Sequence, residues 1–146
     1  MTSTREKGNA FQVWIRKYLE ERGWVVRNFP CTTRPLFLPD PKDPKKKKTV
    51  FVRQSNDVFG CDLVARGSGL VRWIQATLDT GKQKRAEEFS KFWKFTLRGE
   101  SVELWMKKAG GEVEISEWSP VAGKFKPLGR IKKGMFYPDE EIEETL

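Results

Sequence analysis

Residues 56–65 read NDVFGCDLVA, and residues 70–77, beyond a Gly-Ser-Gly turn, read LVRWIQAT. Both stretches are rich in apolar and β-branched residues, so they predict strands over 61–65 and 70–77 that pair across the turn. Because side chains alternate faces along a strand, Gln75 and Thr77 share one face, while Asp62 lies near the start of the neighbouring strand. The sequence therefore predicts three polar side chains side by side at one end of a sheet.

The flanking sequence predicts a single α/β domain in which helices flank one mixed sheet. Ser3 and Glu6 have the spacing of a helix capping box, and apolar residues then recur at helical intervals up to the stop at Gly23. The Pro/Gly/Lys-rich residues 119–138 are expected to be irregular. The further expected elements are strands over 24–29 and 49–53, the latter in one meander with the two strands above, a helix over 83–95 and hairpin strands over 102–106 and 112–118.

A basic arm over residues 30–57 interrupts this domain, which is expected to span residues 1–138. Between Pro30 and Lys48 the chain holds five prolines and a run of four lysines, so we expect a loop or a long hairpin tip. Residues 31–57 carry seven bases and three acids, a net charge of +4. A DNA-gripping arm and a solvated lysine loop are the two interpretations. The expected DNA-contacting residues are Lys45, Lys46, Lys47, Lys48 and Arg53 of the arm, with Lys82, Lys84 and Arg85 beyond the second strand.

The composition excludes several classes of site. The 146 residues contain no His, which excludes His-based zinc sites and His acid/base chemistry, and two Cys cannot form a four-thiolate zinc site. No run approaches the roughly 20 apolar residues of a membrane span, and the N-terminus lacks the apolar core of a secretion signal. We therefore expect a cytoplasmic protein with no membrane partner and with free thiols, Cys61 being buried in a strand.

The charge distribution points to a polyanionic partner. The net charge is +8, but the tail at 139–146 holds five acids, so residues 1–138 have 28 bases, 15 acids and a net charge of +13. Together with an aromatic content of 12%, this favours nucleic acid over a membrane surface. A solubilising surface is the alternative. Five tryptophans lie in periodic segments and are expected to be mostly core: Trp14, Trp73, Trp93, Trp105 and Trp118.

The predicted polar cluster suits metal-dependent phosphodiester chemistry. An oxygen-lined site can hold Mg²⁺ or Mn²⁺ against a scissile phosphate, where the cation polarises the ester and lowers the pKa of the attacking water. Asp62 and Gln75 are the candidate metal ligands. Asp57, in a polar turn before the strand, is a further candidate catalytic residue.

The motif order resembles the PD-(D/E)xK nuclease superfamily and is most similar to archaeal-type Holliday junction resolvases. The resemblance begins at Lys7-Gly8, runs to Gly23, resumes over 62–65 and continues to Gln75-Ala76-Thr77, with weaker echoes over 88–92 and 113–116. It covers roughly two thirds of the chain with short motifs. It implies a restriction-endonuclease-like fold, structure-selective DNA endonuclease activity with Mg²⁺ or Mn²⁺, branched or junction DNA as substrate, roles in DNA recombination and repair, and a homodimer.

The site departs from the family pattern at three positions. The family's helix Glu, four residues after the Lys-Gly pair, falls on Gln12; the Glu of E-x-K falls on Gln75 and its Lys on Thr77, while the strand Asp is kept as Asp62. Two carboxylates are thus replaced by amides. A pair of close charges interacts by about 4 kcal/mol at an effective dielectric near 20, so the exchange should lower Mg²⁺ affinity. The Gln75 amide oxygen and Ala76 carbonyl remain as ligands, and Thr77 can orient water by hydrogen bonding.

Several alternatives stay open from sequence. Asp57, Asp79 or Glu6 could supply replacement carboxylates, while Asp62 and Asp57 could instead be turn formers. Gln75 and Thr77 could be ordinary solvent-face strand residues, and Gln12 an ordinary helix-flank residue. The rival functions are a catalytically inactive DNA-binding protein on the same fold and an interaction subunit of a larger nuclease system.

Overall fold

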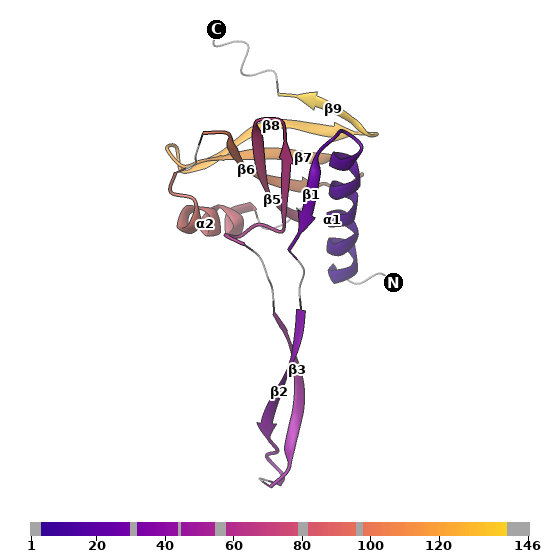
Figure 1. The fold of residues 1–146 in the computed structure, drawn as a ribbon, viewed down its shortest axis with the longest axis vertical. Coiled ribbons are helices and arrows are strands. Elements are labelled where there is room, and N and C mark those ends of the chain that lie inside the picture. The colour runs from indigo at the N-terminus through magenta and orange to yellow at the C-terminus, as the bar shows by residue number, and fades with distance from the viewer. Residues whose placement is uncertain are drawn as a thin grey trace.

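The computed structural model describes residues 4–29, 32–43, 45–54, 58–78, 82–95 and 98–139. Within these ranges the chain is a mixed α/β structure with two helices, one large curled sheet and a separate two-stranded ribbon (Figure 1). The elements in order are α1 (Thr4–Glu20), β1 (Val25–Asn28), β2 (Thr32–Pro39), β3 (Lys47–Gln54), β4 (Leu63–Gly67), β5 (Leu70–Leu78), α2 (Lys82–Phe92), β6 (Glu100–Lys107), β7 (Val113–Ser119), β8 (Lys124–Lys132) and β9 (Met135–Pro138).

The large sheet has the strand order β1-β4-β5-β6-β7-β8-β9. Its neighbours are antiparallel except β5 and β6, which are parallel and joined by a crossover through α2, as a parallel pair requires. The expected pairing of the two strands of the opening stretch is confirmed, with Leu63 opposite Ile74. The expected hairpin is confirmed as β6 and β7, with Trp105 opposite Ile115.

Two apolar clusters form around the sheet, one with each helix. On the α1 side, Phe11, Ile15 and Leu19 pack with a group that includes Ile74 and Trp105. On the α2 side, Phe89 packs with Cys61, Trp93, Val102 and Trp118, and Trp73 borders them. Cys61, Trp93, Trp105 and Trp118 are buried as expected, whereas Trp14 is 38% exposed. Since strand residues alternate faces, Gln75 and Thr77 lie on the same side as Trp73, facing α2.

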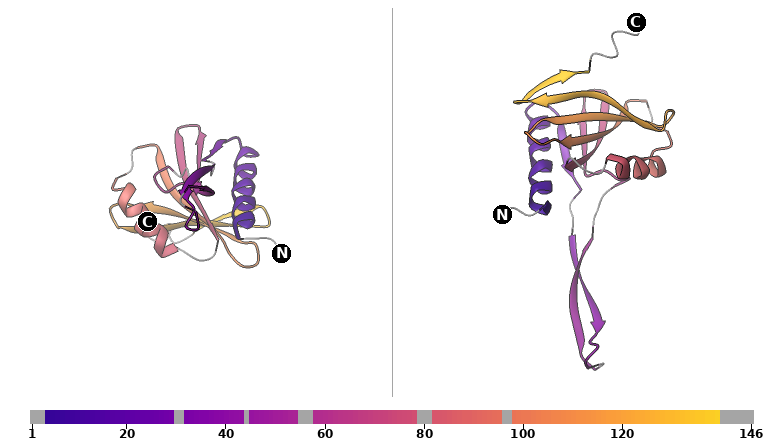
Figure 2. Two further views of the ribbon diagram at one scale, coloured as in Figure 1. Left: turned by 90° about the horizontal axis from the view of Figure 1, so that it is seen from below. Right: turned by 180° about the vertical axis from the view of Figure 1, so that it is seen from behind.

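The basic arm is the ribbon of β2 and β3, an antiparallel hairpin in which Pro35 lies opposite Phe51. Figures 1 and 2 show it projecting away from the large sheet. The expectation of a long hairpin is therefore confirmed, but the prediction that 49–53 belongs to a meander with β4 and β5 is wrong. The strand β2 was not predicted because of its prolines. Both strands of a two-stranded ribbon are edge strands, where a proline is tolerated.

The prediction that residues 119–138 are irregular is wrong, because β8 and β9 extend the sheet there. Along β8, Ile131 is buried while the lysines are exposed. Pro127 lies opposite Ser116, and Gly129 lies opposite Ile115, so Leu128 is the extra residue of a bulge. A bulge is where a sheet accepts a proline within a strand. The lysines, the proline and the bulge together conceal the alternating pattern.

A buried ionic network lies on β5 and β6, and no sequence pattern indicated it. Glu103 is 1% exposed and accepts hydrogen bonds from Arg72 Nε at 2.8 Å and Arg72 Nη2 at 2.6 Å. The Ser101 hydroxyl and the Trp105 indole N–H also donate to this carboxylate. Every oxygen of a buried charge is thereby satisfied, which is what makes burial of an ion pair tolerable.

Glu117 of β7 lies opposite Glu103 and gives a test of this network. Burial and then the Glu103 charge raise the pKa of Glu117, against smaller opposing effects of Lys126 and Arg72. A raised folded pKa means that this group favours folding at low pH and that the contribution is lost as pH rises through the folded pKa. We therefore expect Glu117→Gln to increase the free energy of unfolding at pH 7, by less than about 1 kcal/mol because the side chain is partly exposed.

Urea unfolding of both proteins at pH 4 and pH 7 measures this effect. At pH 4 the two proteins should differ much less, because the wild-type carboxyl is then largely protonated in both states. An equal difference at the two pH values would show that packing, not charge, distinguishes the variant.

Candidate functional site

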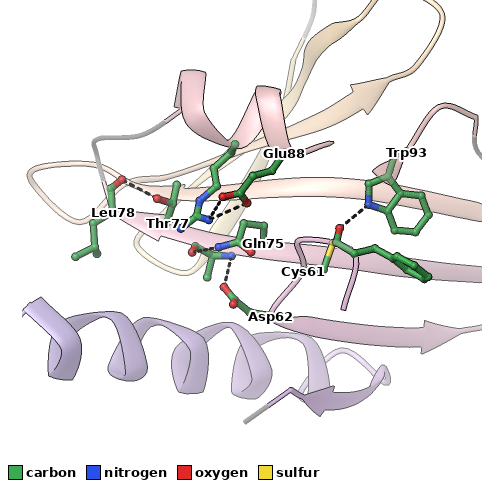
Figure 3. A network of polar contacts seen from close by, with 10 residues as sticks. Cys61, Asp62, Gln75, Thr77, Leu78, Glu88 and Trp93 are labelled. Carbon is green, nitrogen blue, oxygen red and sulfur yellow. Dashed lines mark hydrogen bonds and ion pairs between the residues drawn. The ribbon is translucent and has the colours of Figure 1, made fainter. Parts of the chain in front are cut away.

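Asp62 ties three strands together at one end of the sheet. It is 7% exposed and lies immediately before β4. Its N–H donates to the Ile74 carbonyl at 2.8 Å, and its carbonyl accepts from the Phe29 N–H, just beyond β1, at 2.7 Å. Its carboxylate Oδ2 accepts the Ala76 N–H at 3.1 Å (Figure 3). The carboxylate therefore has a structural role on β5 in addition to any role in chemistry.

Gln75 presents a buried acceptor atom at this end of the sheet. Its side chain is 2% exposed, and Nε2 donates to the Ala76 carbonyl at 3.0 Å. That bond fixes the orientation of the amide, because a carbonyl accepts only from the NH₂ group. Oε1 is left buried, with no hydrogen-bond partner among the described residues. A buried acceptor without a partner costs about 1–3 kcal/mol, so it is a place where a ligand can add stability.

Thr77 and an ion pair of α2 complete the α2 side of the site. The Thr77 side chain is 9% exposed, and its hydroxyl donates to the Leu78 carbonyl at 3.3 Å. Arg85 Nη1 lies 3.0 Å from Glu88 Oε2, and Figure 3 shows Glu88 on the α2 side of Gln75. Glu88 was missed as a site residue; its sequence signals were the weak resemblance over 88–92 and its spacing of three from Arg85 on a helix.

The other predicted catalytic residues lie elsewhere or outside the described residues. Gln12 is half-buried on α1, the helix whose buried residues pack with Ile74 and so cover the face of β5 opposite Gln75. Asp57 and Asp79 lie outside the described ranges, as does the side chain of Glu6. The structure thus brings Asp62, Gln75 and Thr77 to one end of β4 and β5, while Gln12 lies on α1, the helix that packs with Ile74.

The predicted DNA-contacting residues fall into two groups. Lys45 to Lys48 are exposed at the tip of the arm, where Lys47 and Lys48 open β3, and the backbone of Arg53 lies near its other end. Near the site, Lys82 Nζ lies 3.7 Å from Glu114 and Arg85 pairs with Glu88, while Lys84 is exposed. Among the residues that the structure describes, Lys45 to Lys48 have no ion pair, whereas ion pairs offset part of the charge of the second group.

The site has oxygen atoms that could bind a cation, but these atoms carry little negative charge. Asp62 Oδ1 and Oδ2, the orphaned Gln75 Oε1 and the Ala76 carbonyl are oxygen donors, the class that Mg²⁺ and Mn²⁺ prefer. Among the described residues there is no group of three or more Cys, Asp or Glu side chains arranged to hold a metal. These donors are of the kind that a hard dication prefers, but Asp62 is the one carboxylate among them, and Glu88 is paired with Arg85, so we expect weak binding.

Compared with known proteins, the chain matches no protein-family model and no curated protein. Within the described part of the chain, no helix has the length and apolar character needed to cross a membrane.

Proposed function

We propose that this chain is a DNA endonuclease of the PD-(D/E)xK type, similar to Holliday junction resolvases, on a restriction-endonuclease-like variant of the mixed sheet. The observation that best supports the proposal is the buried Gln75 Oε1 beside the Asp62 end of β4, an acceptor with no hydrogen-bond partner among the described residues. The order of motifs from Lys7-Gly8 to Thr77 and the net charge of +8 add support. The substrate class is DNA, held mainly by its phosphates.

In this proposal Asp62 and Gln75 hold Mg²⁺ or Mn²⁺ at the end of β4 and β5. A divalent cation there supplies Lewis-acid polarisation of the phosphodiester and a lowered pKa for the attacking water. Asp62 contributes the negative charge, and its bond to the Ala76 N–H fixes the carboxylate in place. The Gln75 NH₂ bond to Ala76 aims the amide. Thr77, in the family's lysine position, can accept a hydrogen bond from water but cannot supply a positive charge.

The arm gives the DNA contact in this proposal. It leaves the sheet between β1 and β4, so its root adjoins Asp62, whose carbonyl accepts the Phe29 N–H. Lysine contacts to phosphates bind without reading sequence, and their affinity falls as salt rises. A homodimer would bring two such sites to two strands of a junction.

A second candidate function is DNA binding without cleavage on the same fold. The observation that favours it is that Asp62 and Gln75 both bond to the backbone of Ala76, which accounts for their burial structurally. Both candidate functions use the arm to bind DNA, and they differ only in whether a cation binds at Asp62 and Gln75 and the DNA is cleaved.

Cleavage of labelled four-way junction and linear duplex DNA with Mg²⁺, Mn²⁺ or EDTA tests the proposal. Metal-dependent cuts, stronger on the junction, are expected. Tight binding that is indifferent to metal and gives no cuts would select the second candidate. Absence of binding to either DNA at low salt would overturn both.

Gln75→Glu tests the metal site independently of cleavage. The substitution restores a second carboxylate, so we expect Mn²⁺ to raise the melting temperature of this variant by more than it raises that of the wild type. Stabilisation by a ligand follows RT ln(1 + [L]/Kd), so a Kd lowered by about 100-fold adds up to about 2.7 kcal/mol at saturating metal. Equal Mn²⁺ shifts in both proteins would place the cation elsewhere. Ca²⁺ and K⁺ titrations separate site binding from a general ionic effect.

A further inference from the structure

An aromatic groove with a basic rim opens beside α2. Its volume is about 330 Å³, at the small end of ligand pockets. Its rim carries Lys91 and Lys94 with one acid, Glu100. Its aromatic lining residues are Phe59, Trp73, Phe92, Trp93 and Phe95. The proposed function uses none of these residues.

The phenylalanines of the groove expose their rings to solvent. Phe59 is 53% exposed, Phe92 52% and Phe95 73%. The cluster is nevertheless ordered by packing, because Phe59 meets Trp93 edge to face at 5.7 Å and Trp73 at 6.3 Å between ring centroids. Exposed large aromatics that gather in one hollow, rather than being scattered, mark a binding surface.

The turn that carries Phe59 is held in a conformation that a side chain rarely adopts. Phe59 has φ 51°, in the left-handed region, and the following Gly60 has φ 78°. The Trp93 indole N–H donates to the Phe59 carbonyl at 2.9 Å, which anchors the turn on the end of α2. Such strain in a bulky residue costs about 1–3 kcal/mol and is concentrated at ligand-binding sites.

Trp73, which lines the groove, has a buried indole N–H. Trp73 Nε1 is buried and has no hydrogen-bond partner among the described residues. Its ring stacks on Phe29 at 6.4 Å and 20°, next to the root of the arm.

We infer that this groove takes an unpaired nucleobase from a single-stranded segment of DNA. This inference rests on the proposed function and names its substrate as DNA with unpaired bases. Flat aromatic side chains stack on bases regardless of sequence, and Lys91 and Lys94 supply positive charge for the backbone phosphates. The groove also adjoins the site, since Trp73 lies two residues before Gln75 on the same face of β5.

That spacing links the two sites physically. Two residue steps of a strand cover about 6.7 Å, which is about twice the 3.4 Å rise per nucleotide of one DNA strand. When a base occupies the groove, the phosphodiester that is one or two nucleotides further along the same DNA strand therefore lies near Asp62 and Gln75. Junctions, flaps and frayed ends supply such bases, and intact duplex does not.

The test compares a fluorescein-labelled oligo-dT strand with a blunt duplex of equal length by fluorescence anisotropy. The variant Phe92→Ala/Phe95→Ala removes exposed rings and should fold as the wild type does. We expect it to bind single-stranded DNA about ten-fold or more weakly, with duplex affinity within about two-fold and an unchanged salt slope. The matched control, Met135→Ala/Tyr137→Ala, removes exposed side chains from β9 and should leave both affinities unchanged.

A second readout uses 2-aminopurine in the single strand, whose fluorescence should be quenched by wild type and less so by the variant. Unchanged single-strand affinity in the variant, or an equal loss on both DNAs, overturns the inference while leaving the proposed function standing. If the wild type binds neither DNA, the proposed function fails, and the inference fails with it.

Discussion

Asp62→Asn should abolish metal-dependent cleavage while leaving the fold and the DNA affinity in place. The variant keeps a side-chain oxygen that can accept the Ala76 N–H, now made at 3.1 Å by the carboxylate, so the tie between β4 and β5 survives. It removes the one carboxylate among the proposed metal ligands, since the Glu88 carboxylate is paired with Arg85. Loss of a close charge pair is worth about 4 kcal/mol at an effective dielectric near 20, or nearly 10³-fold in metal affinity.

The measurement is the single-turnover cleavage rate of a labelled junction at a fixed, subsaturating Mn²⁺ concentration. We expect the rate to fall by at least about 100-fold, with anisotropy showing unchanged binding. Asp62→Ala is the informative comparison, because it also leaves the Ala76 N–H without its hydrogen-bond acceptor. We expect it to lower the free energy of unfolding by about 1–3 kcal/mol. Cleavage by Asp62→Asn at the wild-type rate would place the catalytic cation away from Asp62.

The core of the sheet could be predicted because its signals are local. Alternating apolar residues and a Gly-Ser-Gly turn are enough to specify β4 and β5, and a glycine turn between apolar runs specifies β6 and β7. The same logic failed for β8, where exposed lysines and Pro127 conceal the alternation. It failed for β2 because a proline rule that holds for central strands does not hold for a free ribbon.

The candidate site was only partly predictable for a different reason. Sequence order and alternation bring Asp62, Gln75 and Thr77 together, because the three belong to one antiparallel pair. Glu88 reaches the same place from a helix that begins after the strand ends, and periodicity does not reveal what a helix covers. The packing of α1, the helix that carries Gln12, on the face of Ile74 is likewise not determined by chain order alone.

The aromatic groove is the feature that was least predictable from the sequence. Phe59, Trp73 and Phe92 come from a turn, a strand and a helix, and each residue alone fits the expectation that aromatic side chains fill the core. Their shared hollow depends on the positive φ of Phe59 and on the Trp93 bond to its carbonyl, two tertiary features. Trp73 Nε1 and Gln75 Oε1, which have no hydrogen-bond partner among the described residues, are likewise identified only from the folded arrangement.

Replacing the four arm lysines, Lys45 to Lys48, with glutamine should weaken DNA binding more than any other surface change. These side chains are exposed at the tip of a ribbon that projects from the sheet (Figure 1), and the described structure gives them no ion pair shorter than 4 Å. The plot of log K against log salt has a negative slope, and each phosphate that a lysine no longer neutralises makes that slope less steep by about 0.9. Removing all four lysine charges should therefore make the slope less steep by about 3–4. The affinity for DNA should fall by about 10²- to 10³-fold near 0.1 M salt.

Anisotropy titrations with duplex DNA between about 50 and 200 mM salt measure both quantities. The matched control replaces four lysines of β8 and the turn after it, Lys124, Lys126, Lys132 and Lys133, which changes the net charge equally at the end of the sheet remote from the arm (Figure 2). If general electrostatic attraction accounted for binding, the two quadruple variants would lose affinity alike. A loss confined to the arm variant, with an altered salt slope, instead locates the phosphate-binding lysines on the ribbon, because counterion release counts only charges that touch the DNA.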